Sequence, residues 1–371
     1  MPKPATPADL TARLKPLRKR LRDAGHDALL VINPVDTRYL TGFVGDDSWT
    51  LIPARGSKVV VLSDARFDEQ IAREAPHVTA VMRKTSLVDA LTTQRDRLKL
   101  TRIAVQKGSL TVAQLEGLKK GLGARGVVAW DEGLITQRAV KDAGEVKLIT
   151  KAGKIQQQAF EELRGFIEPG QTESEVAAFL EYRMRCLGAD GVSFPSIVAA
   201  DANAALPHAI PGRTKIKKNG LVLIDWGAKF KGYCSDMTRV IFTGRGPSKV
   251  MKEVYQVVLD AQLAGIAACQ PGTPLRDVDA AARKVIDDAG YGERFGHGLG
   301  HGIGLDIHEA PTLSHRAAAG AVLEPGQVVT VEPGIYLPGV GGVRIEDDVL
   351  ITSRGHRVLT DLPKTIESAT I

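Results

Sequence analysis

The chain has 371 residues, of which 43% are hydrophobic and 25% charged, so it is long enough for two globular domains with separate cores. The formal net charge is +6, but no aromatic residues alternate with the basic cluster between residues 13 and 22, which argues against nucleic-acid binding. No apolar run has the length needed to span a bilayer, which argues against a membrane protein.

Helices and strands alternate in the first part of the chain. Leucines at positions 10, 14, 17 and 21 predict an amphipathic helix whose solvated face is basic. Short apolar runs at 28–32 and 58–62 predict strands that are buried on both faces, and Asn33-Pro34 is expected to end the first of them. The remaining predicted elements are a helix at 67–74, a strand at 78–82, a helix at 87–98, a strand at 102–105 and a helix at 112–122. We therefore expect an α/β domain over residues 1–135, which ends between Trp130 and Ile135.

The sequence also indicates a cellular compartment. Its first 27 residues lack the apolar region of a signal peptide, and its three cysteines form no C-x-x-C pair. An odd cysteine count without a signal peptide is typical of a reducing compartment. We expect a cytoplasmic protein without disulfides.

The second part of the chain, residues 136–371, contains an internal repeat. Pro169-Gly170-Gln171-Thr172 aligns with Pro271-Gly272-Thr273-Pro274, and each half shows the same order of elements. A long helix, at 141–166 or 248–268, precedes the Pro-Gly turn, and a second helix follows it. Thr172 and Glu175 form a predicted capping box, and Pro274 is predicted at the first helical position of the other half. A histidine-containing segment and a hairpin with two acids complete each half.

The two predicted hairpins place carboxylates opposite each other. A turn centred between Phe230 and Lys231 puts Asp225 opposite Asp236, and a turn centred on Gly339 puts Glu332 opposite Glu346. Like charges directly opposite on antiparallel strands destabilise the pair unless a positive charge lies between them. If the repeat folds as a duplication, its axis brings four carboxylates together, which predicts a site for two metal ions.

Histidines supply the remaining ligand candidates. Three of them, His297, His301 and His308, lie in the Gly-rich segment 295–309, where glycines allow close approach of backbone and ligands. Carboxylate ligands suit divalent ions such as manganese, and one imidazole extends the choice to cobalt, zinc or iron. The chain has no Gly-x-Ser-x-Gly motif and no cysteine beside a histidine motif, which disfavours a covalent nucleophile.

These residues resemble a known family. The ordered set Asp225, Asp236, His301, Glu332 and Glu346 is similar to the dinuclear metal site of the creatinase and methionine aminopeptidase superfamily. The strings His-Gly-Ile-Gly-Leu-Asp-Ile-His-Glu, Val-Glu-Pro-Gly-Ile-Tyr and Val-Arg-Ile-Glu-Asp-Asp resemble its proline-peptidase branch, aminopeptidase P and prolidase. Residues 38–43, Arg-Tyr-Leu-Thr-Gly-Phe, are similar to the creatinase-type N-terminal domain, which ordinary methionine aminopeptidases lack. The resemblance implies a creatinase-like α/β N-terminal domain followed by a pita-bread catalytic domain, a duplicated α-β fold of the α+β class.

The resemblance also implies how the metal ligands divide. Asp225 would bind one ion, His301 and Glu332 would lie on the side of the other ion, and Asp236 and Glu346 would bridge both. A water between two such ions becomes hydroxide near neutral pH and can act as the nucleophile.

Four further residues receive roles from the same resemblance. His208 would contact the intermediate or the scissile nitrogen, His308 the substrate carbonyl, and His297 would line the substrate pocket. Arg344 would support the acids and border the substrate, and Glu332 would also carry the proton. For Asp347 and Asp348, which adjoin Glu346, we expect a solvated or structural position, because neighbours along a strand point to opposite faces.

We therefore expect a metal-dependent Xaa-Pro aminopeptidase acting on short peptides with proline in the second position. The alternative is an Xaa-Pro dipeptidase, or prolidase. More distant alternatives are a creatinase-like hydrolase that works without metal and a non-catalytic pita-bread binding module. A homodimer is expected because relatives with this N-terminal domain are commonly dimers.

Overall fold

Two units make up the chain in this computed structural model, which describes residues 7–130 and 134–371. One unit extends to Gln137 and the other runs from Arg138 to Ile371, so the division lies inside helix α6 (Leu134–Ala139). The sequence reasoning placed the boundary between residues 135 and 136. Residues 131–133, in the predicted boundary region, and the first six residues of the predicted first domain lie outside the described residues.

A mixed sheet with the strand order β4-β3-β2-β1-β5-β6 forms the centre of the N-terminal unit. Strand β1 pairs antiparallel with β2 and parallel with β5. The strands are β1 (Ala28–Val31), β2 (Trp49–Pro53), β3 (Val60–Ser63), β4 (Thr79–Met82), β5 (Ile103–Val105) and β6 (Val127–Ala129). The helices are α1 (Pro7–Asp23), α2 (Pro34–Thr41), α3 (Asp68–Glu74), α4 (Leu87–Leu98) and α5 (Val112–Leu122), with short 3₁₀ turns η1 (Ala65–Phe67) and η2 (Lys107–Ser109).

Every element predicted for this unit is present, and α4 has the predicted bounds. The sequence reasoning missed α2, β2 and β6. It interpreted Asn33-Pro34 as the end of a strand, whereas these residues also begin α2. The Asn33 side chain accepts a hydrogen bond from the Val35 N–H, and Pro34 occupies the first helical position, where its missing N–H does no harm.

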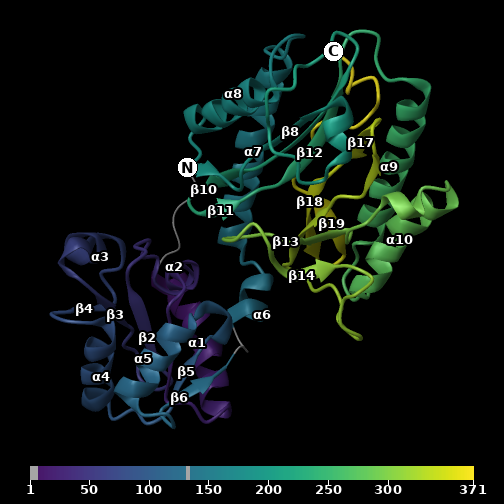
Figure 1. Cartoon of the computed structure of the whole chain (residues 1–371). Helices are drawn as coiled ribbons and strands as arrows, with labels where there is room; N and C mark the ends of the chain where they lie inside the picture. Colours follow the sequence, from purple (N-terminus) through teal and green to yellow (C-terminus); the bar gives the residue numbers. More distant parts are fainter. Residues whose placement is uncertain (1–6, 131–133) are drawn as a thin grey trace. The chain divides into compact units, whose positions relative to one another are not determined.

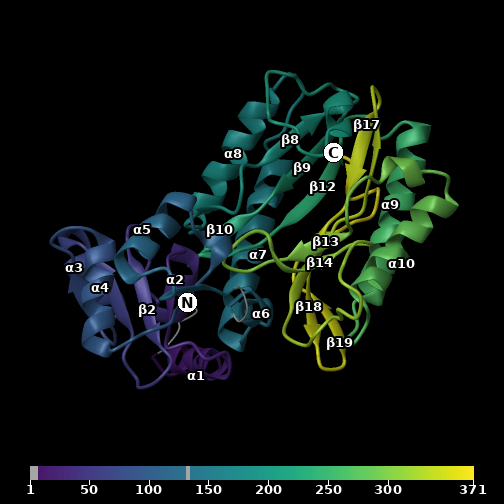
Figure 2. The same ribbon diagram turned by 60° about the horizontal axis from the view of Figure 1, so that its bottom comes forward.

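Helices enclose the strands of the C-terminal unit from two sides. In Figures 1 and 2 the strands lie between the pair α7 and α8 and the pair α9 and α10. These helices are α7 (Ala143–Arg164), α8 (Glu173–Cys186), α9 (Lys249–Ala268) and α10 (Leu275–Asp288), with 3₁₀ turns η3 (Asp201–Ala205) and η4 (Gly292–Arg294). None of the helices in the described ranges combines the length and apolar character required to cross a membrane.

The strands of this unit form small sheets with the orders β11-β10-β7, β12-β9-β8, β14-β13-β15-β18-β19 and β16-β17. Those of the first half are β7 (Gly191–Val192), β8 (Ile197–Ala200), β9 (Leu221–Trp226), β10 (Ala228–Phe230), β11 (Tyr233–Cys234) and β12 (Met237–Phe242). Those of the second half are β13 (Gly300–Gly302), β14 (Glu309–Leu313), β15 (Val328–Val331), β16 (Gly334–Leu337), β17 (Gly341–Arg344), β18 (Asp347–Thr352) and β19 (Gly355–Val358).

The two halves repeat the order of elements that the sequence predicted. A long helix, a second helix and an acid-bearing hairpin follow one another in each, as α7, α8 and β9–β12, and as α9, α10 and β15–β18. The Thr172–Glu175 capping box of α8 is confirmed. At α10 the prediction was wrong by one position, because Pro274 is the N-cap and Leu275 the first helical residue.

The register of one acid-bearing hairpin differs from the prediction. Its turn consists of Lys231 and Gly232, both with positive φ, as in a two-residue type I′ turn. Thr238 therefore lies opposite Asp225, and Asp236 does not. The shift is by two residues, so Asp236 remains on the same face as Asp225, one diagonal step away.

The other hairpin has the predicted register. Gly334 pairs with Arg344 and Val331 pairs with Asp347, so Glu332 and Glu346, between these pairs, lie opposite each other.

Candidate metal centre

The predicted metal ligands lie at strand ends contributed by both halves of the C-terminal unit. Asp225 is the penultimate residue of β9, Asp236 directly precedes β12, and His301 is the middle residue of β13. Glu332 directly follows β15, and Glu346 lies between β17 and β18. Strand ends from two sheets therefore bring residues together that are far apart in the sequence.

Close packing at β13 explains part of the Gly-rich segment. A Cβ on Gly300 would lie 2.0 Å from the Thr330 carbonyl oxygen, and one on Gly302 would lie 2.2 Å from that of Ala310. Any side chain at either position would displace a neighbouring strand. These glycines therefore hold His301 close to β14 and β15.

Three of the five ligand candidates form a tight group. Asp236, His301 and Glu346 each offer one ligand atom, and these atoms all lie within 4.8 Å of one another. His301 Nε2 lies 3.5 Å from Glu332 Oε1 and 3.7 Å from Asp236 Oδ2. The Nδ1 atom of His301 lies 3.0 Å from the Gly302 carbonyl oxygen, so a proton on Nδ1 leaves the Nε2 lone pair facing the acids.

The electrostatics of the site favour a bound cation. Burial, and then the neighbouring carboxylates, raise the pKa values of Asp236 and Glu346 well above their ordinary values. Burial lowers the pKa of His301, which keeps its imidazole neutral and able to bind metal. Asp225 Oδ1, Asp236 Oδ1 and Glu346 Oε1 are buried and have no hydrogen-bond partner within residues 7–130 and 134–371. Buried carboxylate oxygens without partners are costly unless they bind a cation, so this donor set fits divalent ions.

Arg344 lies against the acids, where the sequence reasoning expected it. Its Nη2 donates to Asp225 Oδ2 at 2.5 Å and its Nε donates to Thr238 Oγ1 at 3.0 Å. Thr238 Oγ1 in turn donates to Glu346 Oε2 at 2.7 Å. One guanidinium group therefore orients an acid of each half.

Tyr336 was missed as a functional candidate, although it ends the quoted string Val-Glu-Pro-Gly-Ile-Tyr. Its hydroxyl accepts a hydrogen bond from Arg344 Nη1 at 2.8 Å and lies 3.0 Å from His297 Nε2. Nothing in the sequence separates this tyrosine from a packing residue, because its two partners, His297 and Arg344, come from different segments.

One cavity of about 830 Å³ contains all nine predicted site residues in its lining. These are His208, Asp225, Asp236, His297, His301, His308, Glu332, Arg344 and Glu346. Apolar side chains form much of the remaining wall, among them Phe194, Ile197 and Ile210. The exposed Glu293 and Arg294 also line it, and the sequence reasoning did not single them out.

The three histidines outside the metal group differ in how they are held. His308 packs edge-on against His301, with ring centroids 4.4 Å apart. The His297 segment is tied to α10, where Arg283 Nη2 donates to the His297 carbonyl at 2.8 Å and Asp279 accepts the Leu299 N–H at 3.0 Å. Within the described residues the ring of His208 has no hydrogen-bond partner.

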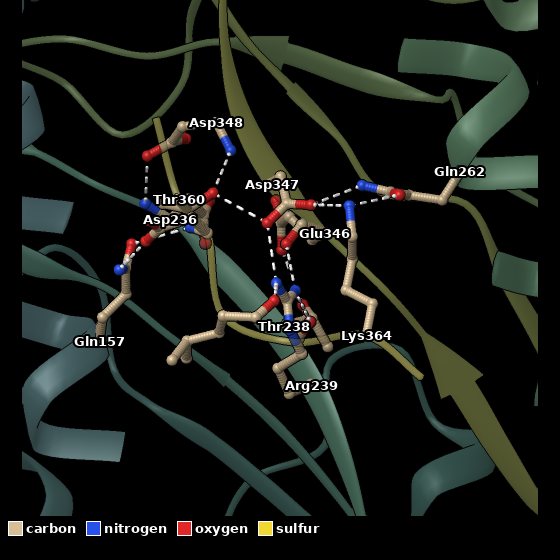
Figure 3. Close-up of polar contacts among 12 residues, drawn as sticks. Gln157, Asp236, Thr238, Arg239, Gln262, Glu346, Asp347, Asp348, Thr360 and Lys364 are labelled. Carbon is tan, nitrogen blue, oxygen red and sulfur yellow. Dashed lines mark hydrogen bonds and ion pairs between the residues drawn. The ribbon is translucent and has the colours of Figure 1, made fainter. Parts of the chain in front are cut away.

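A buried polar network lies behind the acids (Figure 3). The side chains of Asp347 and Asp348 are fully buried, so the solvated alternative is wrong for both and the structural one holds. Asp348 Oδ2 accepts the Asp236 N–H at 3.1 Å. Arg239 donates to the Glu346 carbonyl at 2.6 Å and to Asp347 Oδ1 at 2.8 Å. The backbone at both predicted bridging acids is therefore fixed by buried polar side chains.

Asp347→Ala is expected to lower the free energy of unfolding by about 3–5 kcal/mol, because it leaves the buried Arg239 without its carboxylate partner. Burial opposes ionisation of Asp347, but Arg239 and Lys364 outweigh it and lower its pKa, so a charged carboxylate is lost. Asp288→Ala, in the exposed Lys284–Asp288 pair, is the control and should change stability by less than about 1 kcal/mol. Equilibrium urea unfolding of both variants measures the difference, and equal effects would contradict it.

Comparison with known proteins places the chain in a family. The model of metallopeptidase family M24 matches residues 147–353, and that of the Creatinase/Prolidase N-terminal domain matches residues 13–140. The chain belongs to metallopeptidase family M24. The predicted recognition and fold class, a creatinase-like N-terminal domain followed by a pita-bread catalytic domain, are confirmed.

Individual relatives of this M24 peptidase cover nearly its whole length. It is 38% identical to the uncharacterized peptidase YqhT of Bacillus subtilis, over 95% of this chain and 99% of that one. It is similar to the solved structure of an Xaa-Pro dipeptidase from Bacillus anthracis, with 39% identity, a TM-score of 0.92 and coverage of 96% and 99%. An X-Pro aminopeptidase structure from Thermotoga maritima matches with 36% identity, a TM-score of 0.86 and coverage of 93% and 99%.

Proposed function

We propose that this M24 peptidase hydrolyses the peptide bond before a proline in the second position of short peptides, as an Xaa-Pro aminopeptidase. The observation that carries the proposal is the convergence of four acids and one imidazole on a single cavity, with buried oxygens that have no hydrogen-bond partner in the part of the chain that the structure describes. Relatives named as Xaa-Pro peptidases, similar over nearly the full chain, support the choice of substrate.

The donor set suggests how two divalent ions would be held. Asp225 would bind one, His301 and Glu332 would face the other, and Asp236 and Glu346 would lie between them. Ions bound there would activate a water and stabilise negative charge on the carbonyl oxygen of the substrate. Manganese is our first choice because most donors are carboxylate oxygens, with cobalt, zinc or iron as alternatives that one imidazole permits.

The chain's own residues would bind the peptide and move the proton. The Glu332 side chain is 18% exposed and that of Asp236 only 6%, so Glu332 is better placed to pass a proton to the leaving nitrogen. His208 and His308, on loops at the cavity wall, would contact the scissile bond. His297 and Arg344, joined through Tyr336, would border the substrate.

The size of the cavity favours the aminopeptidase. Its volume of about 830 Å³ is in the upper part of the range typical of small-molecule sites, which leaves space for residues beyond proline. Arg294 favours the second candidate, the Xaa-Pro dipeptidase. Arg294 is a lining residue and has no ion-pair partner among the described residues, so its charge is available to a dipeptide's carboxylate.

A peptide panel separates the two candidates. With manganese present, we expect kcat/KM for Ala-Pro-Ala to exceed that for Ala-Pro by at least about tenfold, because a dipeptide forgoes contacts beyond proline. Ala-Ala-Ala, which has no proline, is the control and should not be cleaved at a comparable rate. Rapid turnover of Ala-Pro alone would favour the dipeptidase and contradict our choice.

We also propose a cytoplasmic homodimer. The three cysteines are free thiols, which fits the reducing compartment expected from the sequence. Light scattering of the purified protein measures the oligomeric state, and a monomer at micromolar concentration would contradict it.

A further inference from the structure

One wall of the cavity depends on a segment without regular strands or long helices. Residues 201–212 connect β8 to the residues that lead into β9, and they include η3. This segment contributes to the lining Ala205, Pro207, His208, Ala209, Ile210 and Pro211. Because the exposed His208 ring has no hydrogen-bond partner among the described residues, its position is set by the backbone of this segment.

A buried carboxylate outside the cavity ties that backbone at both ends. Glu173, the first residue of α8, is 1% exposed and does not belong to the cavity lining. Its Oε1 accepts the Ala200 N–H at 2.7 Å and the Asn203 side-chain amide at 2.9 Å. Its Oε2 accepts the Gly212 N–H at 3.0 Å. One side chain therefore holds the start, the 3₁₀ turn and the end of the His208 segment.

The start of α8 does not require this carboxylate. Thr172 and Glu175 already form a complete capping box there, with the Glu175 N–H bonded to Thr172 Oγ1 and Glu175 Oε2 bonded to the Thr172 N–H. The three donors to Glu173 all belong to the His208 segment or its first flanking residue. Glu173 is therefore buried where it anchors the His208 segment through hydrogen bonds.

We propose that Glu173 is a positioning residue that fixes the His208 segment of the cavity wall and thereby sets the rate of peptide hydrolysis. The inference rests on the proposed function, in which His208 contacts the scissile bond. A displacement of about 1 Å in a catalytic group is enough to slow an enzyme by up to about 100-fold. A loosened segment should therefore reduce activity without any change at the metal ligands.

Glu173→Gln tests the anchoring directly. The amide has nearly the same volume but only one acceptor oxygen, so either Ala200 or Gly212 loses its hydrogen bond whichever way the amide faces. Hydrogen–deuterium exchange of the full-length, metal-loaded protein should be at least about tenfold faster over residues 200–213. Glu175→Ala removes a carboxylate from the same helical turn and serves as the control, in which this segment should keep its wild-type exchange. Unchanged exchange in Glu173→Gln would overturn the inference.

A double-mutant cycle tests the link to catalysis. Glu173→Gln alone should lower kcat/KM for Ala-Pro-Ala by about 10- to 100-fold, with unchanged metal content. In the His208→Ala background the same substitution should have an effect of less than about threefold, because the group that it misplaces is already absent. A general loss of structure would instead reduce activity by the same factor in both backgrounds, and that result would overturn the coupling.

The two readouts separate failure of this inference from failure of the proposed function. If no proline peptide is cleaved with any divalent ion, the proposed function fails, and the exchange measurement still decides whether Glu173 anchors the segment. If peptides are cleaved but His208→Ala has wild-type activity, the claim that Glu173 sets the rate through His208 is overturned.

Discussion

Asp236→Ala and Glu346→Ala are each expected to lower kcat/KM for Ala-Pro-Ala by about a thousandfold or more. Both carboxylates lie in the group whose ligand atoms are within 4.8 Å of one another, and each has a buried oxygen that finds no hydrogen-bond partner among the residues described. Loss of either carboxylate would remove a ligand shared by both ions. The resulting loss of activity should exceed the 10- to 100-fold loss that is typical when a residue that only hydrogen-bonds to a metal ligand is replaced. Elemental analysis of the purified variants should show less bound metal than in the wild type.

His297→Ala is the matched control for these variants. His297 lines the same cavity, but its Nε2 atom lies 3.0 Å from the Tyr336 hydroxyl and does not belong to the ligand group. We expect it to lower activity by no more than about 100-fold and to leave the metal content unchanged. Turnover near the wild-type rate in either acid variant would show that the carboxylate does not bridge two ions.

Exhaustive chelation is expected to abolish peptidase activity, and manganese should restore it. The reason is that the four acids take part in the proposed chemistry only by binding cations, and without these cations no water is activated. The apo protein should also be less stable, since metal that binds only the folded state contributes about 2.7 kcal/mol at a free concentration 100 times its dissociation constant. Calorimetric melting with chelator and with excess manganese measures this change.

Two outcomes of the chelation experiment would support other functions. Activity that survives complete metal removal would favour the creatinase-like alternative, which hydrolyses its substrate without metal. Absence of peptidase activity with manganese, cobalt, zinc and iron alike would favour the non-catalytic binding module. The stability readout is independent of activity, so a melting temperature that does not respond to metal would count against the ligand set itself.

Local patterns in the sequence were sufficient for most secondary structure. Helix α4 has the predicted bounds because its start and its apolar positions are both encoded within a dozen residues, with Ser86 as the N-cap. Helix α2 was missed because Asn33-Pro34 has two local meanings, the end of a strand and the beginning of a helix. Only the hydrogen bond from Val35 to Asn33 decides between them.

The two hairpins show the same limit for strand register. The hairpin around Gly339 has the predicted centre. In the hairpin that carries Asp225 and Asp236, Lys231 adopts a positive φ of 47°. A lysine rarely takes this conformation, and no sequence pattern predicted it. The turn therefore moved by one residue. The strand pairing shifted by an even number of residues, which leaves Asp225 and Asp236 on the same face of the sheet. The prediction that both acids belong to one site therefore did not depend on the exact register.

The sequence by itself determined the chemistry that is available: which residues can bind metal, their order along the chain, and the duplicated elements that carry them. Residue types and their spacing are given directly by the sequence, so the chemistry and the elements that follow from them can be predicted without coordinates. Only the tertiary structure decided how these groups are held. Arg344 on Asp225, Asp348 on the Asp236 N–H and Glu173 on the His208 segment are pairs from distant parts of the chain. Such contacts exist only after the strands and helices have packed, because no local preference encodes which distant donor meets a buried carboxylate.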